Sequence, residues 1–128
     1  MQVDLAPRVS EALKVLEEFR IKATVYLDLG CGDGQIAERV AWMVGVKEVY
    51  GADIDSEVLE NAKLRGIKTF NLDLSKDKIP LNDNSVDLVT AFEVIEHLIN
   101  PDNMLKEVFR VLKEGGHLLL STPNLASW

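Results

Sequence analysis

The sequence has only one cysteine and no long apolar run, and both shortages exclude classes of protein. The single cysteine, Cys31, cannot form an intrachain disulfide or a cysteine-based metal cluster, which fits a reducing compartment. No apolar run approaches the roughly 18 residues of a membrane span, and the first residues lack the basic start and apolar centre of a signal peptide. We therefore expect a cytoplasmic protein that neither contacts a membrane nor holds a metal.

Positive charge is also scarce. Lysine and arginine number 14 against 21 aspartate and glutamate residues, which gives a net charge of −7 and a pI near 4.8. Such a surface repels phosphate backbones, so we expect no nucleic-acid partner. The 128 residues, of which 47% are hydrophobic and 27% charged, are typical of one globular domain with one core.

The apolar residues alternate between helical and strand spacing, with no internal repeat. Helices are predicted to begin at Pro7, Gly34, Ser56 and Asn100, and the last one to stop at the Glu-Gly-Gly of residues 114–116. Strands that are apolar on both faces indicate a parallel sheet covered on both sides, which predicts a doubly wound α/β fold. The five predicted strands are residues 24–30, 47–54, 67–74, 85–92 and 117–122.

Three glycines at alternate positions separate the first of these strands from the helix that follows it. Gly30 allows a sharp turn out of the strand, Gly32 allows a ligand to approach the backbone, and Gly34 allows the helix to pack closely. The simpler interpretation is a loop that only needs positive φ angles. Because ligands of doubly wound sheets bind beyond the carboxyl ends of the strands, we favour a binding loop.

The spacing of the glycines and the nearby acids indicate the kind of ligand. A dinucleotide-binding loop needs a third glycine at the position of Gln35, and here the third glycine is Gly34. Asp28, two residues before the first glycine, favours a cation over a pyrophosphate. Asp53, at the end of the second strand, can accept hydrogen bonds from both hydroxyls of a ribose. The pattern predicts a ligand with an adenosine-like ribose and a positive charge.

These residues carry a resemblance to a known family. The Asp-x-Gly-x-Gly-x-Gly of residues 28–34 resembles motif I of the class I S-adenosylmethionine-dependent methyltransferases, most closely the quinone-biosynthesis branch of type 11 small-molecule enzymes. Further similarity lies in residues 51–63, 71–89, 91–98 and 105–124. The resemblance implies a Rossmann-like, mostly parallel sheet of strand order 3-2-1-4-5, S-adenosylmethionine as cofactor and a small-molecule methyl acceptor.

The resemblance also implies a role for individual residues. Asp28 would reach the ammonium group of the cofactor, and Asp53 its ribose hydroxyls. The methionyl part, the adenine and the methyl donor would be contacted by Gly30, Cys31, Gly32, Gly34, Ile54, Asp73, Leu74, Phe92 and Glu93.

Some of these residues also have simpler interpretations. Asp73 can cap the turn that follows it, and Asp55 is expected to cap a helix. Cys31 fits as a small residue, since no basic neighbour lowers its pKa.

His97 is a candidate catalytic base. It lies four residues after Glu93, so the two share a face if the segment is helical. Methyl transfer from a sulfonium is an in-line displacement that often needs only proximity and orientation, so a base matters only where the acceptor must lose a proton. His117 is expected to be structural.

The family adds a helix and an antiparallel strand pair after the fifth strand, whereas this sequence ends at Trp128. We therefore interpret residues 1–128 as a cofactor-binding methyltransferase domain truncated at its C-terminus. Residues 117–122 would then form an exposed sheet edge through which the chain self-associates. The alternatives are a non-catalytic cofactor-binding module completed by a partner, an aminopropyl transferase, and a nicotinamide enzyme.

Overall fold

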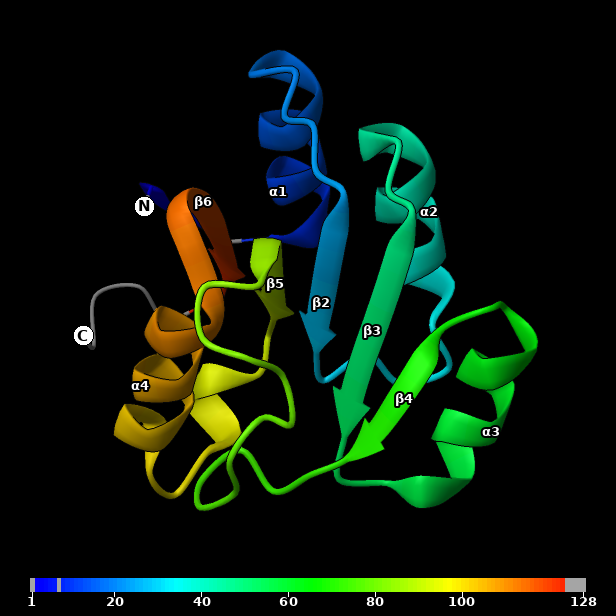
Figure 1. Cartoon of the computed structure of the whole chain (residues 1–128), viewed down its shortest axis with the longest axis vertical. Helices are drawn as coiled ribbons and strands as arrows, with labels where there is room; N and C mark the ends of the chain where they lie inside the picture. The colour runs from blue at the N-terminus through cyan, green and yellow to red at the C-terminus, as the bar shows by residue number, and fades with distance from the viewer. Residues whose placement is uncertain (1, 7, 124–128) are drawn as a thin grey trace.

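The computed structural model describes residues 2–6 and 8–123, which form one six-stranded sheet with all strand pairs parallel (Figure 1). The strand order is β1-β6-β5-β2-β3-β4, so the predicted order 3-2-1-4-5 is confirmed for the last five strands. The strands are β1 Gln2–Ala6, β2 Val25–Leu29, β3 Glu48–Asp53, β4 Lys68–Asn71, β5 Val86–Phe92 and β6 Leu112–Ser121.

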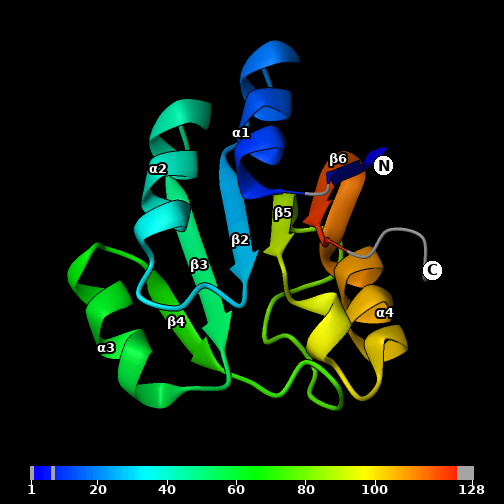
Figure 2. The ribbon, with the colours of Figure 1, turned by 180° about the vertical axis from the view of Figure 1, so that it is seen from behind.

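Helices cover both faces of this sheet, as its apolar strands require. One face is packed by α1 (Val9–Glu18), α2 (Gln35–Val44) and α3 (Ser56–Leu64), and the other by α4 (Pro101–Val111) (Figure 2). The buried residues form one cluster on each face. None of the described helices has the length and apolarity needed to cross a bilayer.

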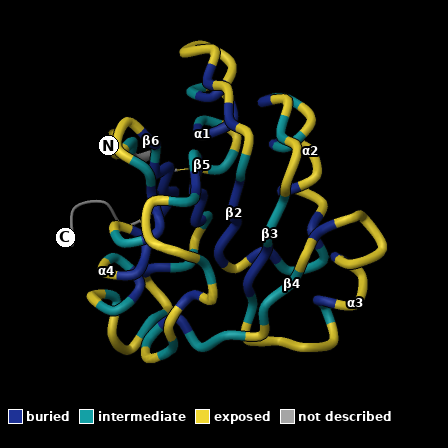
Figure 3. Tube along the Cα trace, in the orientation of Figure 1, coloured by how far each residue is buried: buried dark blue, intermediate teal, exposed yellow. Residues whose placement is uncertain are grey.

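The chain reverses its direction across the sheet between β2 and β5. From β2 it proceeds outward to β3 and β4, and it then returns to form β5 and β6 on the other side. The central strands β2 and β5 are buried along most of their length, whereas the loops at their carboxyl ends mix buried, half-buried and exposed residues (Figure 3). A ligand site of a doubly wound sheet is expected at such a reversal.

The N-terminal residues form a strand that the sequence analysis missed. β1 pairs in parallel with β6 from Gln2–His117 to Ala6–Ser121, so the edge at residues 117–121 is covered. The prediction that this edge is exposed, which was the reason to expect self-association, is therefore wrong. The physical reason is the polar–apolar alternation of residues 2–5, which is a short strand signal placed directly before the predicted helix. Pro7, predicted to open that helix, lies outside the described residues.

The boundary between α4 and β6 also differs from the prediction. The helix ends at Val111, and β6 begins at once with Leu112, five residues earlier than predicted. Gly115 adopts a φ of +82°, and the register of β6 against β5 shifts between Val86 and Leu88. The glycines at 115 and 116 therefore lie within an irregular strand rather than terminating the helix.

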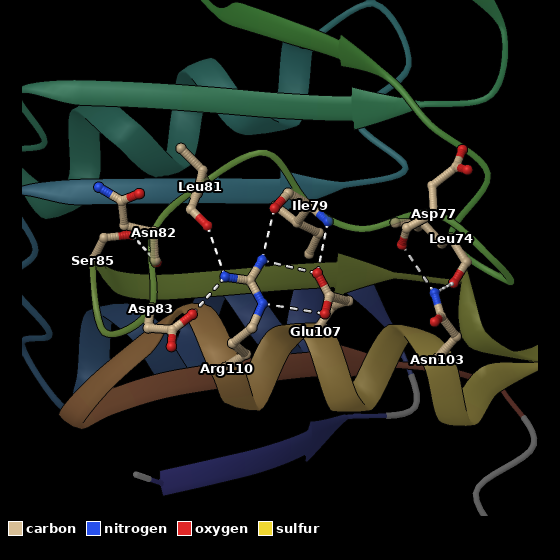
Figure 4. A network of polar contacts seen from close by, with 10 residues as sticks. All are labelled: Leu74, Asp77, Ile79, Leu81, Asn82, Asp83, Ser85, Asn103, Glu107 and Arg110. Atoms are coloured by element: carbon tan, nitrogen blue, oxygen red, sulfur yellow. Dashed lines mark hydrogen bonds and ion pairs between the residues drawn. The ribbon is translucent and has the colours of Figure 1, made fainter.

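An arginine on α4 fixes the long connection between β4 and β5 (Figure 4). Arg110 donates to the carbonyl oxygens of Ile79 at 2.7 Å and Leu81 at 2.9 Å, and it forms ion pairs with Glu107 and Asp83. Glu107, only 6% exposed, accepts a hydrogen bond from the backbone of Ile79 at 2.8 Å. This network holds the connection against α4.

Candidate functional site

The loop between β2 and α2 carries the three glycines of the motif, each with a left-handed backbone. Their φ angles are +71° at Gly30, +56° at Gly32 and +86° at Gly34. A Cβ atom at Gly30 would overlap Val94, and one at Gly34 would lie 2.5 Å from Ile67. A Cβ at Gly32 would meet no atom within 4 Å. Packing therefore requires two of the glycines, whereas Gly32 borders open space from which a ligand can approach the backbone.

Asp53, at the carboxyl end of β3, holds this loop in place. Its carboxylate accepts a hydrogen bond from the backbone N–H of Gly32 at 2.9 Å and another from that of Asp55 at 2.9 Å. Asp55 in turn caps α3, as predicted, by accepting from Glu57 at 2.9 Å. A carboxylate has about four acceptor positions, so Asp53 keeps acceptor capacity after these two bonds.

A pocket of about 310 Å³ lies at the carboxyl edge of the sheet, over the reversal between β2 and β5. It contains seven of the predicted site residues, namely Gly30, Asp53, Ile54, Asp73, Leu74, Glu93 and His97. Its remaining lining is Leu72, Ser75, Val94, Leu98 and Ile99. The other predicted residues, Asp28, Cys31, Gly32, Gly34 and Phe92, lie outside this lining.

A second hollow, of about 920 Å³, lies at the opposite edge of the sheet, near the starts of β2 and β5. Its lining includes Thr24, Trp42 and Asp87 and none of the predicted site residues. Asp87 there accepts hydrogen bonds from the backbone of Thr24 and Val25 at 3.1 and 2.8 Å, which is a structural role. The larger volume thus lies away from the glycine loop and its carboxylates.

Asp28 lies beneath the glycine loop, within β2, and is 3% exposed. Its carboxylate accepts a hydrogen bond from the hydroxyl of Thr90 at 2.6 Å, and the hydroxyls of Thr90 and Tyr26 lie 2.5 Å apart. Burial, with a smaller contribution from the charge of Asp53, raises the pKa of Asp28 to about 7, and the bond from Thr90 opposes that rise. Asp28 forms no ion pair with any residue that the structure describes.

Two predicted residues show the geometry of their simpler interpretation. The carboxylate of Asp73 accepts from the backbone N–H of Ser75 at 2.9 Å, so it caps the turn, although it also lines the pocket. Cys31 is 7% exposed, and burial together with the charges of Asp28 and Asp53 raises the pKa of its thiol to about 12. A thiol with that pKa is not a nucleophile at neutral pH.

The segment from Glu93 to His97 is not a continuous helix, so the condition under which the two residues would share a helical face is not met. Glu93 has a φ of +56°, and only Ile95–His97 form a short 3-10 helix. The backbone N–H of Glu93 instead donates to the carbonyl oxygen of Ser121 at 2.7 Å, which turns the chain away from helical geometry. Both residues nevertheless reach the pocket lining, from opposite ends of this turn.

Sequence reasoning missed Thr90, whose hydroxyl donates to Asp28, and Tyr26, whose hydroxyl bonds that of Thr90. Both are fully buried on neighbouring strands of the face that α1 and α2 cover. Residues with hydroxyls are ordinary in strands, and only the pairing of Thr90 opposite Asp28 would have indicated their contact. It also missed the apolar rim of the pocket, where Ile99 is 97% exposed.

A parallel doubly wound sheet, a glycine loop and a carboxylate at the end of the next strand define a nucleotide-cofactor-binding α/β domain. Comparison with known proteins narrows this class. Residues 27–120 match the family described as methyltransferase domain, and the chain belongs to this family.

Similar proteins include the mitochondrial ubiquinone biosynthesis O-methyltransferase of Candida albicans, 40% identical over 113 residues, which cover 80% of this chain and 34% of that protein. Among solved structures, a SAM-dependent methyltransferase from Aquifex aeolicus is 34% identical with a TM-score of 0.65, and the match covers 80% of this chain and 58% of that one. One from Mesorhizobium loti is 26% identical with a TM-score of 0.74, covering 88% and 52% respectively. The chain spans about a third to a half of the length of the curated relatives that it matches.

Proposed function

We propose that this domain binds S-adenosylmethionine and takes part in methyl transfer to a small-molecule acceptor. The observation that carries the proposal is the combination of the open backbone at Gly32 with two carboxylates of different burial, Asp28 and Asp53. The family membership and the ubiquinone biosynthesis O-methyltransferase among the similar proteins support it.

The residues present fit this cofactor. Asp53 has acceptor capacity left for a ribose diol, and Ile54, which is 71% exposed in the pocket lining, offers apolar surface to an adenine ring. The buried carboxylate of Asp28, without a cationic partner among the described residues, suits the ammonium group. Leu72, Leu74 and Val94 supply the apolar lining that excludes water.

When bound, S-adenosylmethionine supplies an electrophilic methyl group on a sulfonium. The work of the chain is then to bind and orient, because an in-line displacement depends chiefly on the placement of the two reacting groups. His97, with its side chain 76% exposed at the pocket mouth, is placed to accept a proton from an acceptor hydroxyl. Glu93 lies in the same lining and is the second candidate for that role.

The proposal predicts that the protein binds S-adenosylmethionine and S-adenosylhomocysteine and does not bind NAD with comparable affinity. Isothermal titration calorimetry with the three ligands measures this directly. Binding of NAD as tight as that of either adenosyl compound would contradict the proposal. Incubation with radiolabelled S-adenosylmethionine and a metabolite extract then tests for transfer, and cofactor binding without transfer would identify a non-catalytic binding module.

The role of Asp53 is tested by Asp53→Asn, which keeps the shape of the side chain. We expect a loss of about 1.5–3 kcal/mol in cofactor binding, or roughly ten- to a hundredfold, because charge-assisted hydrogen bonds are lost. Asp102→Asn, on the exposed first turn of α4, is the matched control and should leave the affinity unchanged. Equal affinities for both variants would show that Asp53 does not hold the ribose.

A further inference from the structure

A chain of three polar side chains crosses the buried sheet face below the glycine loop. Tyr26 and Asp28 are on β2, and Thr90 lies between their polar groups on β5, where it pairs with Asp28 in the strand register. Tyr26 and Thr90 are 0% exposed, and Asp28 is 3% exposed. Buried polar groups are costly unless they bond one another, so this arrangement needs a reason beyond packing.

The two hydrogen bonds that join Tyr26, Thr90 and Asp28 have a defined direction. The hydroxyl of Thr90 has one hydrogen, and it donates that hydrogen to the carboxylate of Asp28 at 2.6 Å. The oxygen of Thr90 must therefore accept from the hydroxyl of Tyr26, at 2.5 Å. Burial raises the pKa of Tyr26 well above its ordinary value, so the phenol remains a donor at neutral pH. Both hydroxyls thus act in series on the carboxylate.

The surroundings of Asp28 contain negative and apolar groups. Asp53 from β3 and Cys31 from the glycine loop are the other titratable groups whose charges interact with Asp28 or lie beside it. The helices on this face, α1 and α2, contribute apolar residues to the buried cluster, among them Leu13, Leu16 and Val40. In the described structure, the hydrogen bond from Thr90 is therefore what favours the ionised carboxylate, and Tyr26 acts only through its hydrogen bond to Thr90.

We propose that Tyr26 and Thr90 are positioning residues, whose serial hydroxyl groups orient the Asp28 carboxylate and keep it in the accepting state that a cationic cofactor group requires. The proposal rests on the proposed function in that it assigns Asp28 to the ammonium group. It extends that function to two residues that do not touch the cofactor. A consequence is that cofactor binding and the proton of Asp28 compete, so that affinity increases with pH up to about neutrality.

The first test needs no cofactor. Carbon-13 NMR of the Asp28 carboxyl group measures its titration midpoint, expected near 7 in the unaltered protein. Thr90→Val removes the donor and should raise the midpoint by about one pH unit. Tyr26→Phe should raise it by less, because Thr90 still donates. Thr90→Ser retains the hydroxyl and should restore the original midpoint.

Matched controls are available on the strands beyond the site. Thr69→Val on β4 repeats the Thr90→Val exchange away from Asp28, and Tyr50→Phe removes a hydroxyl that bonds the exposed Glu48. Neither should move the midpoint of Asp28. If Thr90→Val fails to fold, the titration midpoint of Asp28 in Tyr26→Phe decides whether the proposal holds. A midpoint unchanged in every variant that folds would overturn the proposal.

The second test measures S-adenosylhomocysteine binding by calorimetry between pH 6 and pH 9. Because the expected shift lowers the ionised fraction of Asp28 about fivefold at pH 7, Thr90→Val should weaken binding about fivefold at pH 7 and much less at pH 9. Thr90→Ser should stay within about threefold of the unaltered protein. A loss that is the same at every pH would indicate a purely structural effect and would refute the positioning role. If the unaltered protein does not bind S-adenosylhomocysteine, the proposed function itself fails, while the NMR titration still decides what the two hydroxyls do.

Discussion

Two buried carboxylates on opposite faces of the sheet differ in what surrounds them. Glu107 on α4 is 6% exposed, and the adjacent Arg110 is the main cause that holds its pKa below the ordinary value. Asp28 on β2 is 3% exposed and accepts a hydrogen bond from the hydroxyl of Thr90, and burial raises its pKa to about 7. Glu107 has a cation from the same chain, whereas Asp28 has none among the described residues.

The contrast separates a residue that stabilises the fold from one that is available to a ligand. The ion pair of Glu107 with Arg110 holds the connection between β4 and β5 against α4 through the backbone of Ile79. A buried carboxylate without a cation costs folding free energy. Such a cost is typical of functional sites, where a ligand supplies the missing charge.

The largest expected effect comes from making Glu107 resemble Asp28. Arg110→Met leaves Glu107 without its cation and the carbonyl oxygens of Ile79 and Leu81 without their donor. We expect a loss of about 3–5 kcal/mol in the free energy of unfolding, measured by urea denaturation. Arg8→Met, which breaks the exposed pair with Glu11, is the control and should cost less than about 1 kcal/mol. Equal losses would show that Glu107 does not depend on its arginine.

The next effect comes from removing the charge of Asp28. The pKa of Asp28 rises from 3.8 to about 7 on folding, so between these pH values the folded protein keeps a proton that the unfolded chain has lost. Stability contributed by this group is therefore complete below pH 4 and is lost as the pH rises to 7. Asp28→Asn abolishes this loss. We subtract the free energy of unfolding of the unaltered protein from that of the variant, and we expect this difference to be about 2–4 kcal/mol larger at pH 8 than at pH 4.

Urea denaturation at the two pH values measures this difference, and the comparison cancels any pH-independent cost of the amide. Asp102→Asn, on the surface of α4, is the control, and its stability relative to the unaltered protein should change little between the two pH values. The same Asp28→Asn variant should bind S-adenosylhomocysteine less tightly. If the stability difference between Asp28→Asn and the unaltered protein were the same at pH 8 as at pH 4, Asp28 would not be a buried charge in solution.

The smallest expected effect comes from two glycines of the loop, of which Gly34 is a packing residue and Gly32 borders the space open to a ligand. A Cβ at Gly34 would lie 2.5 Å from Ile67 and 3.3 Å from Ala62, so the close approach that this glycine permits is to α3 and the start of β4. Gly34→Ala should cost about 1–3 kcal/mol of stability. Gly32→Ala, with no atom within 4 Å, should cost only about 1 kcal/mol, for its positive φ.

Variants at the two glycines should also differ in their affinity for S-adenosylhomocysteine. Gly32→Val is expected to abolish S-adenosylhomocysteine binding while the protein stays folded, because the side chain occupies the space from which the ligand approaches. Gly34→Ala should bind normally in the fraction that remains folded. Parallel loss of folding and binding in both variants would mean that Gly32 is also a packing residue.

Local sequence patterns were enough to specify the class of the fold and to indicate the sheet edge where the candidate site lies. Apolar strands that alternate with helices specify a parallel sheet. The order of its last five strands was predicted from the resemblance to the methyltransferase family, and the structure confirms that order. The glycine loop and Asp53 lie at the carboxyl edge of the sheet, as local spacing predicted, and their role in binding stays a prediction. β1 and the start of β6 were missed, since four alternating residues and a glycine pair are weak local signals, and pairing with a neighbouring strand decides the structure there.

The contacts between distant polar residues depend on the folded chain and not on any local pattern. Thr90 is 62 residues from Asp28 along the chain, and Arg110 is 31 residues from Ile79, so no local pattern indicates either contact. Both follow from strand register and helix packing, which the whole core sets at once. The charge state of Asp28 depends on that same burial. Whether an aspartate is an exposed cap, as Asp55 is, or a buried carboxylate with a pKa near 7, is decided by the dielectric and the partners that the fold brings to it.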